Sequence, residues 1–114
     1  MDDWTRADLI DNVLTRLGVK AAGEAATAED SNTVGSASDG VHKKLQGEGL
    51  AAFELSAIPE WAQTDVSRLV CAEVAEVYGL DVKKYLALAG EAKRSLRTQQ
   101  SRTGHKLPIR ACYY

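Results

Sequence analysis

Apolar residues at helical spacing, in segments bounded by capping residues and glycines, constrain the fold of this chain most. Thr5 and Asp8 form the first capping pattern. The Thr5 hydroxyl can accept a hydrogen bond from a first-turn backbone amide that has no partner within the helix, and the Asp8 carboxylate lies at the positive end of the helix dipole. Gly18 suits the left-handed position that ends many helices. We predict a first helix between these signals, with an apolar stripe formed by Leu9, Ile10, Val13, Leu14 and Leu17.

A second helix is predicted from about residue 28 to residue 47. Thr27 and Asp30 repeat the capping pattern, and Gly47 and Gly49 end the segment. Many residues of this segment are glycine or serine, which are poor helix formers, so packing rather than propensity must stabilise it. Its sparse apolar stripe consists of Val34, Ala37, Val41 and Leu45.

A third helix is predicted from Pro59 to Gly79, after an apolar connection at Leu50–Ile58 that is extended or forms a single turn. Proline suits the first helical position, because the amide hydrogen that it lacks would have no partner there. The apolar stripe of this helix is the strongest in the chain and predicts the central core helix. Its members are Val66, Leu69, Val70, Val74, Val77 and Tyr78.

A fourth helix is predicted after its capping residue Asp81, extending to about residue 103, where Gly104 breaks it. Its apolar positions are Val82, Tyr85, Leu86, Ala89, Ala92 and Leu96. The chain cannot be helical around Pro108, which favours an extended conformation for the residue before it. We therefore predict an all-α fold, a small four-helix bundle over residues 1–104 followed by an extended C-terminal docking tail over residues 105–114.

Charge divides the chain into two parts that the net value of −2 conceals. Residues 1–82 hold 15 acids and 6 bases, whereas residues 83–114 hold 8 bases and the single acid Glu91. The composition, 45% hydrophobic and 26% charged, is ordinary for a soluble domain, and 6% aromatic residues disfavour an all-β sandwich. No apolar run approaches the roughly 20 residues of a membrane span, so we expect no membrane partner.

The histidines and cysteines do not form a recognisable catalytic or metal site. His42, Cys71, His105 and Cys112 include no pair at the short spacing of zinc ligands, so neither a metal nor a cofactor is expected. Cys71 lies beside the apolar stripe of the third helix and is expected to be a small buried hydrophobic residue. The acids lack a matching set of substrate-binding residues, and we expect no enzymatic activity. Two thiols and an acidic N-terminus favour a reduced, intracellular protein without a signal peptide.

A run of bases without any acid extends from Lys93 to Arg110. It is compatible with a solvated helix end that the helix dipole favours, with contacts to phosphate, or with an acidic protein surface such as a neighbouring copy of the chain. The residues that would form a subunit interface or face DNA are Lys93, Arg94, Arg97, Arg102 and Lys106.

The predicted tail is more apolar than a C-terminal extension usually is. An extended segment with aromatic anchors suits β-augmentation, in which backbone hydrogen bonds bind a partner chain and pockets accept alternate side chains. The alternative is that the tail folds back over its own core. The residues that we expect to dock are Leu107, Pro108, Ile109, Arg110, Tyr113 and Tyr114.

Four segments together resemble a known family. They are the first helix at Asp8–Val19, the polar second helix, the Ile58–Trp61 segment that leads into Leu69–Gly79, and the basic last helix with its extended tail. This pattern is similar to that of the head–tail connector, or adaptor, proteins of tailed bacteriophages and related gene-transfer particles. The resemblance implies a small helical bundle, many copies of which form a ring, typically a dodecamer, beneath the portal and extend the DNA channel.

The resemblance also implies partners and a location. The six tail residues named above would bind the portal protein, a downstream tail or stopper protein would bind the ring, and channel DNA would make non-specific contacts. The protein would belong to the virion, assembled in the host cytoplasm. Opposite charges on two faces of each subunit would favour head-to-tail contact and ring closure. The alternative is a small helical DNA-binding protein, such as a terminase small subunit, that uses Lys93 to Arg110 on phosphate.

Overall fold

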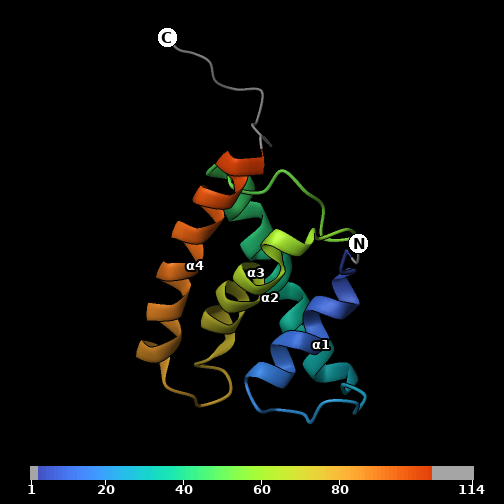
Figure 1. Ribbon diagram of the computed structural model, residues 1–114. Coiled ribbons are helices and arrows are strands. Elements are labelled where there is room, and N and C mark those ends of the chain that lie inside the picture. Colours follow the sequence, from blue (N-terminus) through green and yellow to red (C-terminus); the bar gives the residue numbers. More distant parts are fainter. Residues whose placement is uncertain (1–2, 104–114) are drawn as a thin grey trace.

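The computed structural model describes residues 3–103, and the side chains of residues 3–101 (Figure 1). The helices in this part of the chain are α1 (Arg6–Arg16), α2 (Ala28–Gly47), α3 (Glu60–Val74) and α4 (Val82–Thr103). Between residues 3 and 103 the only β pairing is one antiparallel bridge between Trp4 and Ile58. The predicted all-α, four-helix fold is therefore confirmed, whereas the predicted tail over residues 105–114 lies outside the described residues.

Helix α3 occupies the centre of the bundle. Figure 1 shows α1 and α4 on opposite sides of the molecule, with α2 and α3 between them. Helix α3 packs against each of the other three helices, whereas α4 packs against α3 and no other helix. The prediction that the third helix is the central core helix is confirmed. Helix α4 is consequently an edge helix.

Local capping chemistry sets where three of the helices begin. The Thr5 hydroxyl accepts the amide hydrogen of Asp8, and the Asp8 carboxylate accepts that of Thr5, which completes the capping box before α1. Thr27 accepts the amide hydrogen of Asp30 at the start of α2. The Asp81 carboxylate accepts two amide hydrogens of the first turn of α4. All three predicted caps are confirmed.

The core combines the helical stripes with the connection between α2 and α3. All five apolar residues predicted for the first helix are buried, and three of the four in α2 are buried with Ala37 partly so. The Leu50–Ile58 connection adds four buried residues, Leu50, Ala51, Leu55 and Ile58. Ile58 exchanges two backbone hydrogen bonds with Trp4, of 2.9 and 2.8 Å, and this pairing ties the connection to the segment before α1.

Helix α3 is shorter than predicted. It begins at Glu60, with Pro59 as its N-cap, and it ends at Val74 rather than at Gly79. The next residues form a turn in which the Leu80 amide donates to the Ala75 carbonyl, and Gly79 adopts a φ of +69° that directs the chain towards α4. Val77 falls in this turn and is 66% exposed, so its predicted place in the core is wrong.

The predicted apolar stripe of α4 is also partly wrong. Ala92 and Leu96 are fully buried, but Val82 is 36% exposed and Leu86 is 57% exposed. The physical reason is that α4 contacts one helix instead of two. A helix with one neighbour buries only the part of its apolar face that this neighbour covers, and the remaining apolar side chains stay exposed.

Two glycines of α2 provide a matched test of helix propensity. A Cβ at Gly40 would enter open space, whereas a Cβ at Gly35 would lie 2.7 Å from Nη2 of Arg6. That guanidinium is paired with Asp39 at 3.1 Å. Gly40→Ala should raise the free energy of unfolding by about 0.5–1 kcal/mol. Gly35→Ala should raise the free energy of unfolding by less, because the new methyl group forces the exposed Arg6–Asp39 ion pair to move. Urea denaturation followed by circular dichroism measures both, and equal gains would contradict this account.

Candidate functional site

The second half of helix α4 is attached to the bundle by three kinds of contact. Leu96 packs into the core, and the Gln100 amide donates to the Gly49 carbonyl after α2. Lys93 forms an ion pair of 3.1 Å with Glu48. Two of these contacts join α4 to the end of α2, at Glu48 and Gly49, while Arg94 and Arg97 of α4 are exposed.

A buried carboxylate joins α3 to α4. Asp65 is 7% exposed and is hydrogen-bonded to the Ser95 side chain. Burial raises the pKa of Asp65, while the Ser95 hydrogen bond and the charge of Arg68 oppose the rise. Because the folded pKa is higher than the unfolded one, this group stabilises the fold below its ordinary pKa, and the contribution is lost as the pH rises through the folded pKa.

Asp65→Asn should therefore stabilise the protein at neutral pH. The amide keeps an oxygen that can accept from Ser95 but carries no buried charge, so we expect a gain of about 1 kcal/mol in the free energy of unfolding at pH 7. The gain should shrink as the pH falls towards the ordinary pKa of an aspartate, because the native carboxyl becomes neutral as well. Urea denaturation across this pH range measures the difference. A gain that is independent of pH would contradict the assignment.

The basic residues predicted for an interface have different environments. Lys93 is paired with Glu48 and is half-buried, whereas Arg94 and Arg97 are exposed on the outer side of α4. Arg102 belongs to α4 but its side chain lies outside the described part, as does the whole of Lys106. The structure thus brings two of the five predicted residues to one open face, and it assigns Lys93 an intramolecular partner.

An apolar groove follows one side of α4, between α2 and α3. It has a volume of about 150 Å³. Leu86 and Ala89 line it from α4, and Val82 lies one turn before Leu86 on the same helical face. The other lining residues are Val41, Lys44, Leu45, Leu69, Ala72, Glu73 and Lys93. We call the groove with Val82 and Leu86 the α4 patch. Sequence reasoning missed it, because helical spacing indicated that both residues would be buried.

The two edges of the molecule carry different charge. On the α4 edge, Lys83, Lys84, Arg94 and Arg97 are exposed. The opposite edge, at α1 and the start of α2, carries exposed acids, and two of its bases are already paired: Arg6 with Asp39 and Lys20 with Asp11. The exposed acids of that edge are Asp3, Asp8, Asp11, Glu24 and Glu29. Glu91 is the single acid of α4 and is exposed, and the remaining acids are spread over the other elements.

Cys71 and His42 occupy structural positions. The Cys71 thiol is 1% exposed and lies 3.9 Å from the Val13 carbonyl oxygen, and burial raises its pKa to about 11. The His42 ring lies 2.7 Å from the Phe53 carbonyl oxygen. No group of three or more metal-ligating side chains occurs among the described residues. The expectation that Cys71 is a small buried residue is confirmed.

A thiol of this kind should react slowly. In a Cys112→Ser variant, where Cys71 is the remaining thiol, we expect reaction with a disulfide reagent at pH 8 to be roughly a hundredfold slower than after denaturation. The reason is that burial both suppresses the thiolate and blocks access to it. The rate is measured from the absorbance of the thiolate that the reagent releases when it reacts. Equal rates in the native and denatured protein would show that Cys71 is accessible.

Comparisons with protein-family models, with curated proteins and with solved structures each found no match for this chain. Among the described residues, no helix combines the length and apolar character needed to cross a membrane.

Proposed function

We propose that this protein is a head–tail adaptor of a tailed bacteriophage or related particle, a structural virion protein without enzymatic activity. In this proposal, copies of the chain form a ring beneath the portal, typically a dodecamer, which extends the DNA channel and joins the head to the tail. The observation that carries the proposal is the exposed α4 edge, where an apolar groove with two exposed aliphatic side chains lies beside unpaired bases.

The α4 patch fits a contact between subunits. Val82 and Leu86 expose apolar surface at an edge helix, and such surface beside polar residues is typical of protein–protein contacts. The groove next to them would receive side chains of the neighbouring subunit. Because this face differs from the α1 edge, contact between the two is heterologous, which is the type of contact that closes rings.

Charge supports the same arrangement. Arg94 and Arg97 on the α4 edge would face the acidic α1 edge of the next subunit. Such complementarity mainly speeds association and selects the correct register. Assembly should accordingly become slower at high salt, because exposed charges are screened.

The tail and its partners complete the proposal. Residues 105–114 would leave the bundle after α4 and bind the portal protein, while a downstream tail or stopper protein would bind the opposite face of the ring. Channel DNA would contact the ring without sequence preference. Deletion of residues 105–114 should abolish binding to the portal in a pull-down assay with the helical circular dichroism signal retained. Unchanged binding would contradict the role of the tail.

The ring itself is tested by a pair of neighbouring substitutions in α4. Leu86→Gln replaces an apolar side chain of the α4 patch, and Ala87→Gln places the same side chain at the next, also exposed, position. Native mass spectrometry and electron microscopy, with and without the portal, should show rings for the wild type and for Ala87→Gln but monomers for Leu86→Gln. A wild-type protein that stays monomeric and never joins a portal would overturn the proposal.

A second candidate, a small DNA-binding protein such as a terminase small subunit, is favoured by one observation. The exposed bases of α4 have no carboxylate partner within 4.0 Å among the described residues, apart from Lys93. Titration of duplex DNA at several salt concentrations distinguishes the two functions. Tight, sequence-specific binding by the free monomer would support this candidate, whereas weak and non-specific binding fits the adaptor.

A further inference from the structure

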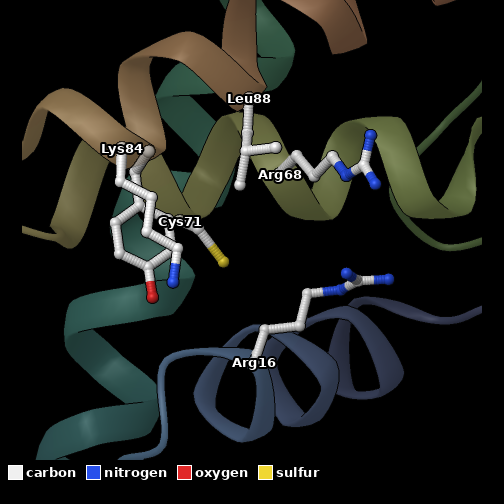
Figure 2. Close-up of a pocket in the computed structure, with 6 residues that line it drawn as sticks. Arg16, Arg68, Cys71, Lys84 and Leu88 are labelled. Atoms are coloured by element: carbon white, nitrogen blue, oxygen red, sulfur yellow. The ribbon is translucent and has the colours of Figure 1, made fainter.

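A second pocket is lined by residues of α1, α3 and α4 (Figure 2). Its volume is about 170 Å³, enough for several water molecules or one tetrahedral oxyanion. Arg16 enters it from α1 and Arg68 from α3, and Figure 2 shows the two side chains on opposite sides of one gap. The full lining consists of Arg16, Arg68, Cys71, Lys84, Tyr85 and Leu88.

Three cations line this pocket, and none has an ion-pair partner among the described residues. Four other cations of the described chain each lie within 3.3 Å of a carboxylate; they are Arg6, Lys20, Lys44 and Lys93. The charge of Arg68 lowers the pKa of the buried Asp65, but the Asp65 carboxylate is hydrogen-bonded to Ser95 and forms no ion pair with Arg68 within 4.0 Å. Cations without partners that line one pocket repel one another, and a bound anion would relieve this repulsion.

Two of the cations are held in position before any ligand binds. The Nε of Arg16 donates to the Oδ1 of Asn12 at 2.7 Å, and the buried Ser67 hydroxyl donates to the same oxygen. This bond uses one donor of the guanidinium and leaves its two terminal nitrogens for an acceptor. The Lys84 ammonium lies over the Tyr85 ring, 5.3 Å from its centroid. Fixed donors bind an anion at a smaller entropic cost than free ones.

The thiol of Cys71, which lines the pocket, is not expected to react covalently with a ligand. Cys71 directs its sulfur towards the gap, as Figure 2 shows, and the charge of Arg16 lowers its pKa to a small extent. Burial outweighs that effect, so the thiol stays protonated near neutral pH. Cys71, Tyr85 and Leu88 thus form the uncharged part of the lining.

We infer that this pocket binds a phosphate group, held by Arg16, Arg68 and Lys84. Guanidinium groups suit tetrahedral oxyanions because they donate paired hydrogen bonds, and a doubly charged phosphate matches three cations better than a carboxylate does. The phosphate can come from free inorganic phosphate or from the backbone of a nucleic acid. This inference does not depend on ring formation, so it can fail or succeed independently of the proposed adaptor function.

The test is a titration of the full chain with inorganic phosphate at constant ionic strength, followed by amide NMR spectra. Saturable shifts are expected at residues that line the pocket. Arg16→Gln and Arg68→Gln should each weaken binding about tenfold, since each removes a charge-assisted pair of hydrogen bonds. Lys43→Gln, which removes an exposed base of α2 away from the pocket, should change the affinity less than about twofold.

Arg16→Lys guards against a loss caused by misfolding. It keeps the charge but not the paired donors, so a folded Arg16→Lys protein should bind with intermediate affinity. A parallel titration with a short DNA duplex distinguishes the sources. Shifts at the pocket that Arg16→Gln weakens would identify a nucleic-acid backbone as a source, and shifts with inorganic phosphate alone would identify the free anion. The absence of saturable shifts at the pocket with either probe, or shifts unchanged by both glutamine variants, would overturn the inference.

Discussion

Leu96→Ala is expected to lower the free energy of unfolding by about 2–5 kcal/mol, the usual cost of removing a fully buried leucine side chain. Leu96 has no exposed surface, and it is the largest fully buried side chain among the described residues of α4. Because α4 packs chiefly against α3, few other contacts can compensate for the lost one. Urea denaturation followed by far-ultraviolet circular dichroism measures the change.

Leu86→Ala is the matched control for this substitution. It deletes the same atoms from the same helix at a position that is 57% exposed, and we expect a change within about 0.5 kcal/mol. A large loss for both variants would mean that α4 is buried on two sides. A small loss for both would mean that Leu96 does not anchor the helix. Only the predicted contrast supports α4 as an edge helix held at its second half.

Tyr78→Phe is expected to cost about 1.5 kcal/mol, because the variant loses a hydrogen bond to a charged acceptor. The Tyr78 hydroxyl donates to Oδ1 of Asp30 at 2.9 Å and thereby ties the turn after α3 to the first turn of α2. Tyr85→Phe, in which no comparable bond to a described side chain is lost, should change the free energy of unfolding by less than about 0.5 kcal/mol. Equal costs for the two variants would contradict the role of the hydroxyl.

The pH dependence of this difference has a defined sign. Burial and the Asp30 carboxylate raise the pKa of Tyr78 to about 12. A raised pKa means that the protonated hydroxyl stabilises the fold below its ordinary pKa of 10.0, and that this contribution is lost as the pH rises towards 12. The cost of Tyr78→Phe should therefore be constant up to about pH 10 and shrink above it. Denaturation curves at several alkaline pH values measure the trend.

The sequence predicted a helix start well where the interacting residues are only a few positions apart along the chain. The capping box joins Thr5 to Asp8 and the α2 cap joins Thr27 to Asp30, each over three residues, so both could be found in the sequence. The glycine- and serine-rich α2 forms against its poor propensity, because Val34, Val41 and Leu45 are buried in the core. For α2, the spacing of apolar residues predicted the helix better than the intrinsic helix propensity of its residues did.

The candidate sites could be predicted only in part. The bases of α4 are visible in the sequence, but the Glu48 partner of Lys93 lies 45 residues away and no spacing rule connects the two. The pocket proposed to bind phosphate was not foreseen, since Arg16, Arg68 and Lys84 come from three helices and are brought to one pocket only by folding. The exposure of Leu86 was mispredicted for a related reason. The spacing of apolar residues shows which face of a helix is apolar, but not how many neighbouring helices cover that face.

By itself, the sequence determined the all-α class, the order of the four helices and the caps at which three of them begin, because these depend on contacts within a few residues. The tertiary structure decided that α4 lies at an edge, that α3 ends at Val74, and that Val77, Val82 and Leu86 are exposed. It also decided which cations are paired and which converge on a pocket. These features depend on which helices pack together, and that is settled by long-range contacts that local periodicity does not encode.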